Sequence, residues 1–402
     1  MGVGGGAALG VGGGTRSGRI VIAGAGLAGL RAAQAARAAG HEGEIVLVGD
    51  EPHAPYTRPP LSKELLKGEQ TAEGCAFPGL DVLEAELRLS TVIASADADA
   101  HTVTFDDGDT LGYDRLIVAT GAHARRLPGL TSGHTLRSLD DAARLLAALD
   151  GARRLAIVGA GFIGCEVAAS VRKNGIEVAL IDLAPQPLLP LGSELGERVA
   201  AMHREHGVEL HLGAGIERVD EDGVHLAGGA TVAADCVLIA VGATPSTGFL
   251  DGSGVELDPT GGVVCDATLT SVSAPDVLAA GDIACWPHPG AGGERVRVEH
   301  WTTAAEHGRL AGRNAMSEPS ERAAHVAPPY FWSDQYDVKI QSVGFPAMAE
   351  RIEIVESDDD GRRLVAEALD TRSDPPRLVG AVAFNHARRL AEYRRRLAVE
   401  YA

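Results

Sequence analysis

The chain has 402 residues and a formal net charge of −19, from 36 Lys and Arg against 55 Asp and Glu. This charge argues against general nucleic-acid binding, which needs a basic surface to neutralise phosphates. The length predicts two or three domains, and the lack of an apolar run of bilayer length predicts a soluble protein that engages no membrane.

Residues 1–18 are rich in glycine and lack the basic region and apolar core of a signal peptide. We expect them to form a disordered leader on a cytoplasmic protein. The cysteines are scattered, with no C-x-x-C pair and no metal-ligand spacing, which indicates reduced, buried thiols and no metal site. They are Cys75, Cys165, Cys236, Cys265 and Cys285.

A strand, a glycine-rich turn and a helix open the first predicted unit. The apolar run 19–23 leads into the spacing G-x-G-x-x-G and then into an alanine-rich helix at 27–39. Such a turn lets the backbone approach a pyrophosphate, which the free N–H groups at the helix N-terminus stabilise. The acid after the next strand, Asp50 with Glu51 as the alternative, is expected to bind ribose hydroxyls. The turn glycines are Gly24, Gly26 and Gly29.

A proline-rich loop follows at residues 51–63. Its prolines predict a stiff, non-helical path until Ser62 can cap a short helix. Arg58 and Lys63 lie close in sequence to the first phosphate turn, so we favour a role in the site for both over a solvated loop.

A buried strand at 113–121 ends in the small residues Ala119, Thr120 and Gly121. Small residues at this place would let the backbone approach a cofactor. A helix is predicted next, near 139–149.

The same pattern recurs from about residue 154. The strand 155–158 leads into a second G-x-G-x-x-G turn and a helix, and the strand 178–181 ends at Asp182. One copy is weak evidence, because methyltransferases and chance loops share it. Two copies, each with an acid at the expected distance, suggest one site for a flavin and one for the nicotinamide that reduces it. The second turn contains Gly159, Gly161, Ile163 and Gly164.

The strand at 235–242, which ends at Gly242, repeats the closing strand of the first unit. This echo suggests that one doubly wound unit is inserted into another. We therefore predict an α/β fold with two doubly wound dinucleotide-binding domains and a C-terminal α+β domain. The predicted bounds are 19–121 with 243–324 for the flavin-binding domain, 122–242 for the nicotinamide-binding domain and 325–402 for the C-terminal domain.

After the insertion, a strand delivers Asp282 to a tight turn, and a helix is predicted from 302 to about 316. Trp301 and Trp332 are two of the three tryptophans of the chain. In a chain with 4% aromatic residues we expect these rings to border a planar cofactor, with core packing as the alternative.

Six motifs together resemble the FAD-dependent ferredoxin and rubredoxin reductases, which serve cytochrome P450 and ring-hydroxylating dioxygenase systems and are akin to putidaredoxin reductase and apoptosis-inducing factor. The resemblance covers the chain from about residue 19 and implies a glutathione-reductase-like fold. The motifs are P-Y-x-R-P-P-L-S-K from Pro55, A-T-G from Ala119, G-F-I-G-x-E from Gly161, A-A-G-D from Ala279, E-H-W from Glu299 and F-W-S-D-Q-Y from Phe331.

The resemblance implies a set of site residues. Lys63 and Glu166 correspond to an ion pair beside the flavin N5, and a buried lysine indeed needs such a partner. Trp301 and Trp332 would lie near the flavin ring, and these four residues are the expected catalytic set. The residues expected to bind FAD are Gly24, Gly26, Gly29, Asp50, Arg58, Lys63, Ala119, Thr120, Gly121, Asp282 and Trp301. Those expected to bind NADH are Gly159, Gly161, Ile163, Gly164, Asp182 and Gly242.

The implied enzyme is an NADH-dependent ferredoxin reductase. A hydride passes from NADH to FAD N5, and single electrons then pass to a ferredoxin or rubredoxin that serves a P450 or ring-hydroxylating oxygenase. NADH is favoured because Asp182 would accept from its 2′-hydroxyl and repel a 2′-phosphate, and residues 183–186 contain no arginine. The alternatives are an NADH oxidase or small-molecule reductase, and a signalling flavoprotein similar to apoptosis-inducing factor.

We expect a monomer or weak homodimer. Ferredoxins are usually acidic, so an arginine-rich terminal helix at 387–399 is the candidate docking face, with a solvated helix face as the alternative. His203 and His206 lie on an expected surface helix, where we interpret them as solvated. The arginines of the terminal helix are Arg388, Arg389, Arg394, Arg395 and Arg396.

Overall fold

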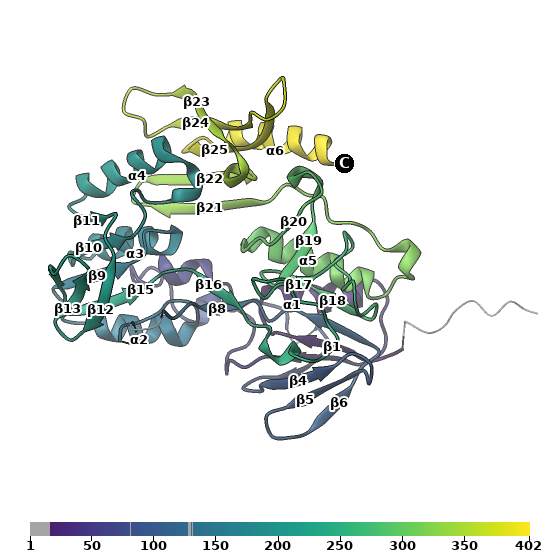
Figure 1. Cartoon of the computed structure of the whole chain (residues 1–402). Coiled ribbons are helices and arrows are strands. Elements are labelled where there is room, and N and C mark those ends of the chain that lie inside the picture. Colours follow the sequence, from purple (N-terminus) through teal and green to yellow (C-terminus); the bar gives the residue numbers. More distant parts are fainter. Residues whose placement is uncertain (1–16, 81, 128–129, 131) are drawn as a thin grey trace, which may run out of the picture.

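The structure is a computed structural model that describes residues 17–80, 82–127, 130 and 132–402 (Figure 1). The leader predicted at 1–18 lies outside the described residues except for its last two positions. Within the described part of the chain, no helix is both long enough and apolar enough to span a membrane.

The first unit is built on a parallel sheet of five strands in the order β18-β7-β1-β2-β3. The strand β18 comes from far along the chain, because a second unit is inserted in the sequence between β7 and β18. The strands are β1 (Ile20–Ala23), β2 (Ile45–Val48), β3 (Glu86–Arg88), β7 (Arg115–Val118) and β18 (Val277–Ala279). A small antiparallel sheet joins β4 (Ile93–Asp97), β5 (Thr102–Phe105) and β6 (Thr110–Gly112). A small mixed sheet joins β17 (Val263–Val264), β19 (Ala284–Pro287) and β20 (Arg295–Val296).

Two helices, α1 (Leu27–Ala38) and α5 (Trp301–Asn314), pack against each other in this unit. A Cβ atom on Gly308 or Gly312 of α5 would overlap the carbonyl oxygen of Ala28 or Ala32 in α1. Glycine therefore allows the two helix backbones to touch.

The inserted unit repeats the first on a parallel sheet in the order β11-β10-β9-β15. Its strands are β9 (Arg154–Val158), β10 (Glu177–Asp182), β11 (Glu209–Leu212) and β15 (Cys236–Ile239). Its helices are α2 (Leu139–Leu149), α3 (Phe162–Lys173) and α4 (Ser193–Glu205), and an antiparallel sheet joins β12 (Ile216–Asp220), β13 (Gly223–Leu226) and β14 (Thr231–Ala233).

The chain enters and leaves the inserted unit through two paired strands. The strand β8 (Ala122–Ala124) is antiparallel to β16 (Ala243–Pro245), and both lie between the two units in Figure 1.

A C-terminal antiparallel sheet, in the order β21-β22-β25-β24-β23, lies above both units in Figure 1. One face shares a hydrophobic core with the inserted unit, and the other packs against α6. The strand β21 contacts both α3 and α5. These elements are β21 (Tyr330–Gln335), β22 (Val338–Gly344), β23 (Arg351–Ser357), β24 (Leu364–Asp370), β25 (Arg377–Phe384) and α6 (Ala387–Tyr401).

Two local predictions were wrong. Ser62 does not cap a helix; it ends a short 3₁₀ turn, Pro59–Ser62, because the prolines already have the φ that the first residues of a helical turn require. His203 is not solvated, because α4 turns it toward the C-terminal sheet and buries it completely, whereas His206 is half-buried. The prediction of buried free thiols is confirmed for the five cysteines.

Candidate active site

A cavity of about 760 Å³ lies where the three parts of the chain meet. Its walls bring together most of the residues that the sequence singles out. From the first unit these are Gly24, Gly26, Asp50, Arg58, Lys63, Ala119, Thr120, Gly121, Asp282 and Trp301; from the inserted unit they are Gly161, Ile163, Glu166 and Gly242; from the C-terminal sheet the residue is Trp332. Gly29, Gly159, Gly164 and Asp182 are not among the wall residues.

Three helices begin at the cavity without a side-chain cap: α1, α3 and α5. Their first N–H groups and positive dipole ends are therefore available to an anion. At Gly26 and Gly161, the N-caps of α1 and α3, a Cβ atom would meet no neighbour, so a ligand can approach the backbone there. Gly29 and Gly164 act differently, because a Cβ on either would overlap the carbonyl oxygen of the glycine that opens its own turn.

Arg58 is held at the cavity wall by a local network. Its Nη2 lies 2.5 Å from Glu51 Oε1, and its Nη1 donates to the Tyr56 hydroxyl over 2.7 Å. The Tyr56 hydroxyl donates to the other oxygen of Glu51, so each oxygen of this carboxylate has one partner in the loop. Asp50 also lines the cavity, and its side chain forms no hydrogen bond or ion pair with any described residue.

Sequence reasoning missed Arg137, which also lines the cavity. Its Nη2 pairs with Asp282 Oδ2 at 2.6 Å, and its Nε donates to the Ala122 carbonyl. No motif that we identified contains this arginine. It comes just before Ser138, which forms the N-terminal capping box of α2 together with Asp141.

A buried ion pair joins Lys63 to Glu166. The Nζ and Oε2 atoms are 2.7 Å apart, and the side chains are 6% and 3% exposed. Ser62 Oγ donates to the same oxygen over 2.5 Å, and Ser333 Oγ donates to Glu166 Oε1 over 2.7 Å. The predicted pair is thus present, while the two serines that complete it were not predicted as site residues.

Aromatic rings form one wall of the cavity. The rings of Trp301 and Trp332 meet edge to face with centroids 6.0 Å apart. Burial lowers the pKa of His300 to about 4, so its imidazole is neutral. The Trp301 Nε1 and His300 Nδ1 atoms are buried without a hydrogen-bond partner. Buried polar atoms are normally paired, so this wall suits a planar ligand that carries polar atoms.

Asp182 lies at the end of β10 and forms a hydrogen bond to the second glycine turn. Its Oδ2 accepts from the Ala160 N–H over 2.6 Å, and its Oδ1 accepts from the Ala184 N–H over 2.7 Å. A carboxylate can accept about four hydrogen bonds, so both oxygens retain capacity for a ribose hydroxyl.

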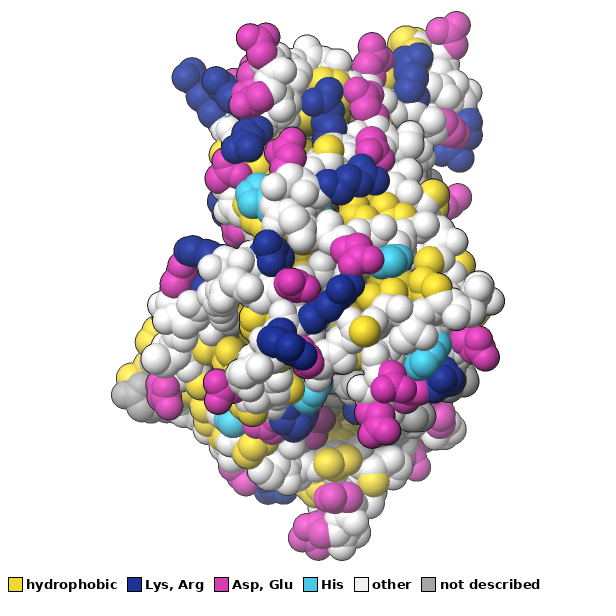
Figure 2. Space-filling view, turned by 90° about the vertical axis from the view of Figure 1, so that its left-hand side faces the viewer, with side chains coloured by type: hydrophobic (Ala, Val, Ile, Leu, Met, Phe, Trp, Pro, Cys, Tyr) yellow, Lys and Arg dark blue, Asp and Glu magenta, His cyan; other side chains and the backbone are white. Residues whose placement is uncertain are grey.

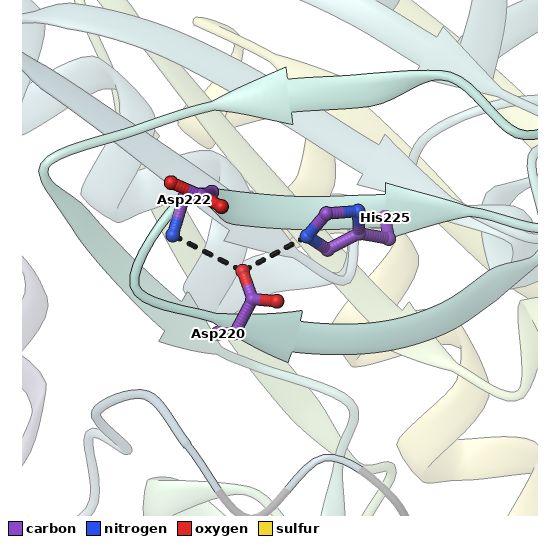
Figure 3. Close-up of side chains that lie close together, drawn as sticks. All are labelled: Asp220, Asp222 and His225. Carbon is purple, nitrogen blue, oxygen red and sulfur yellow. Dashed lines mark hydrogen bonds and ion pairs between the residues drawn. The ribbon is translucent and has the colours of Figure 1, made fainter.

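Figure 3 shows a second cluster of polar side chains, in the turn between β12 and β13. Asp220 Oδ1 accepts from the Asp222 N–H at 3.1 Å and lies 2.8 Å from His225 Nε2. Arg218 forms a further ion pair with Asp220. These partners already neutralise Asp220, so the cluster is explained by the hairpin and carries no metal assignment.

Comparison with known proteins assigns the chain to a family. Residues 18–308 match the pyridine nucleotide-disulphide oxidoreductase family. The chain belongs to this family. Residues 330–401 match the reductase C-terminal family, which agrees with the separate C-terminal sheet. The predicted family resemblance and α/β fold class are confirmed, and the chain is an oxidoreductase of the pyridine-nucleotide type.

Relatives match almost the whole length of the chain. The chain is 38% identical to the ferredoxin–NAD(+) reductase component of the p-cumate 2,3-dioxygenase system of Pseudomonas putida, over 94% of this chain and 92% of the relative. It is 34% identical to rhodocoxin reductase of Rhodococcus erythropolis, over 95% and 90%. The structure superposes on a chain of the covalent putidaredoxin reductase–putidaredoxin complex with a TM-score of 0.86, at 29% identity, over 95% and 93%.

We predict that Lys63→Met destabilises the protein, because it leaves the Glu166 charge buried without a cation. The free energy of unfolding in urea should fall by about 3–5 kcal/mol, and the double variant Lys63→Met/Glu166→Gln should recover part of the loss.

The matched control is Lys173→Met, which breaks a pair with Glu69 in which the lysine is 63% exposed, and which should cost about 1 kcal/mol or less. Equal losses for the two lysine variants would contradict this account of the buried pair.

Proposed function

We propose that this protein is an FAD-dependent NADH:ferredoxin oxidoreductase, which passes electrons to a ferredoxin or rubredoxin serving a P450 or ring-hydroxylating oxygenase. The observation that carries the proposal is the cavity itself, in which two glycine turns at uncapped helix N-termini face one space beside a buried lysine–glutamate pair. Two of the relatives, the ferredoxin–NAD(+) reductase component of the p-cumate dioxygenase system and rhodocoxin reductase, support the same assignment.

The cavity residues fit FAD. The turn at Gly24 and Gly26 and the N-terminus of α1 would hold the pyrophosphate, and Arg58 and Arg137 supply cations on the same wall. Asp50 would bind the adenosine ribose and Asp282 the ribityl chain. The rings of Trp301 and Trp332, with the unpaired Trp301 Nε1 and His300 Nδ1, would border the flavin. Ala119, Thr120 and Gly121 would let the backbone lie close to it.

Bound FAD supplies the acceptance of a hydride from NADH and its release as single electrons. The chain supplies position and charge. Glu166 fixes the Lys63 ammonium at the cavity wall, and that charge, with the N-terminus of α5, would stabilise negative charge on a bound flavin. The aromatic wall excludes water. The turn 159–164 and Gly242 would bind NADH.

NADH-driven cytochrome c reduction tests the function. We expect strong stimulation when a small [2Fe–2S] ferredoxin is added to the FAD-loaded protein. Rapid NADH turnover with oxygen alone would instead favour the oxidase, and slow turnover with every carrier together with NADH-induced dimerisation would favour the signalling flavoprotein. Either result would overturn the reductase assignment; a response to rubredoxin alone would identify the other carrier class.

We predict that Asp182 sets the preference for NADH. Asp182→Ala should lower the ratio of kcat/KM for NADH to that for NADPH by roughly 10- to 150-fold, because a charged hydrogen bond to the 2′-hydroxyl is lost. The ratio is the proper readout, since Asp182 also holds the Ala160 and Ala184 N–H groups and its loss slows both reactions. Asp222→Ala, exposed in the β12–β13 turn of the same unit, serves as control. An unchanged ratio would contradict the prediction that Asp182 sets the preference for NADH.

The surface charges narrow the choice of a docking face for an acidic carrier. Figure 2, which views the left-hand side of Figure 1, shows basic and acidic side chains interspersed over that face. On α6, Arg389 pairs with Glu392 and Glu356, and Arg394 pairs with Glu306, so these two predicted docking residues are partly neutralised. The exposed residues Arg388, Arg395 and Arg396 form no ion pair with a described residue.

A second basic patch lies on α5, the helix that begins at the cavity. Arg309 and Arg313 are exposed one turn apart and form no ion pair with any described residue. Burial and the neighbouring positive charge of Arg309 lower the pKa of Arg31 on α1. We propose this patch, the α5 arginines, as the main docking face because it lies on the helix that begins at the cavity.

Charge reversal distinguishes the two faces. Arg309→Glu/Arg313→Glu should raise KM for ferredoxin roughly tenfold at low salt and weaken its salt dependence, because electrostatic steering is lost. Arg395→Glu/Arg396→Glu on α6 is the matched control and should have the smaller effect. Reduction of a small dye should not change in either variant. A larger effect on α6 would move the docking face to the terminal helix.

A further inference from the structure

His203 of α4 belongs to a hydrogen-bonded chain that ends at Glu166. Its side chain is 0% exposed, and its Nε2 lies 3.2 Å from Gln335 Oε1. Gln335 Nε2 in turn donates to Ser333 Oγ over 3.2 Å, and Ser333 Oγ donates to Glu166 Oε1 over 2.7 Å. This hydrogen-bonded chain starts at α4 of the inserted unit, passes through β21 and ends on α3 at the buried ion pair.

The direction of each bond follows from the carboxylate. Glu166 can only accept, so Ser333 uses its one hydroxyl proton toward Glu166 and offers lone pairs to Gln335. Gln335 must therefore present its NH₂ group to Ser333 and its carbonyl oxygen to His203. As a result, the Nε2 atom of His203 carries the proton.

Tyr336 fixes the other ring nitrogen of His203. The Tyr336 hydroxyl lies 2.9 Å from Nδ1, and His206 stacks on the Tyr336 ring with centroids 3.6 Å apart. Burial lowers the pKa of His203 to about 4, so the imidazole is neutral and its Nδ1 accepts. Burial also raises the pKa of Tyr336, which keeps its hydroxyl a donor.

We propose that His203 is a positioning residue of the reductase site, which orients the Glu166 carboxylate through Gln335 and Ser333 and thereby fixes the Lys63 ammonium. The hydrogen-bonded chain is not a path for proton transfer, because the amide of Gln335 does not release a proton at neutral pH. Without the His203 N–H, Gln335 is free to turn over. Ser333 can then donate to the Gln335 carbonyl, and Glu166 Oε1 loses its donor.

This inference rests on the proposed function, because it assigns a role in flavin reduction, but its first test needs no turnover. In the wild-type holoprotein labelled with ¹⁵N-histidine, the His203 imidazole should be neutral with its proton on Nε2 between pH 5 and pH 8. Its loss in His203→Gln assigns the signal. A proton on Nδ1 instead, or a charged ring at pH 7, would overturn the proposal.

Three variants then test the effect on the site. His203→Phe keeps a ring and removes the donor, His203→Gln keeps an N–H donor, and His206→Phe is the control, which keeps a ring stacked on Tyr336. The readouts are the single-turnover rate constant of flavin reduction by NADH, KM for NADH and the flavin midpoint potential.

We expect His203→Phe to slow flavin reduction roughly two- to tenfold, the effect of one neutral hydrogen bond, and to lower the flavin potential without changing KM for NADH. His203→Gln should restore most of the rate, and His206→Phe should match the wild type. Equal losses in both phenylalanine variants, or no recovery with glutamine, would show that α4 packing alone is at work and overturn the proposal. Because no ferredoxin is present, a failed ferredoxin assay would overturn the function and leave this test intact.

Discussion

A positive and a negative charge buried against each other constrain everything around the cavity. Removing the Lys63 ammonium and the Glu166 carboxylate from water carries a large desolvation penalty, which their attraction offsets only if the remaining acceptor sites are also satisfied. Ser62 and Ser333 complete this requirement, and they come from the proline-rich loop and from β21. The pair therefore obliges three distant parts of the chain to meet at one point, and the cavity opens beside that point.

The two glycine turns solve the complementary problem of binding negative charge in an acidic protein. The helices α1, α3 and α5 present uncapped N-termini to the cavity, whereas α2 closes its own N-terminus with a capping box. The three helix N-termini at the cavity thus keep their backbone N–H groups available to a ligand. Glycine at the N-caps of α1 and α3 keeps that approach open, and glycine one turn later lets each helix pack on its own turn.

Local patterns predicted the parts of this site that depend on local structure. Strand, turn and helix are consecutive in sequence, so both turns and Asp50 could be named from the local pattern. The Lys63–Glu166 pair joins distant parts of the chain and was implied by the family resemblance. Arg137 could not, because only the tertiary fold brings it to Asp282. His203 shows a missed signal: it follows Leu195 and Val199 at four-residue spacing on the buried face of α4. Its polar side chain suggested solvent, and its partners lie more than a hundred residues away on β21.

The paired strands β8 and β16 have a consequence for how such an enzyme can be taken apart. They place the start and the end of the inserted unit side by side, with Ala124 opposite Ala243 and Ala122 opposite Pro245. A segment whose two ends are adjacent can be exchanged as a cassette between homologues without stretching the remaining chain. Under the proposed function, a transplanted cassette would change the nicotinamide preference and would keep the carrier face, provided that it retained the counterparts of Glu166 and His203. The inserted unit is thus separable at the β8–β16 pair, while the Lys63–Glu166 pair ties it to the rest of the fold.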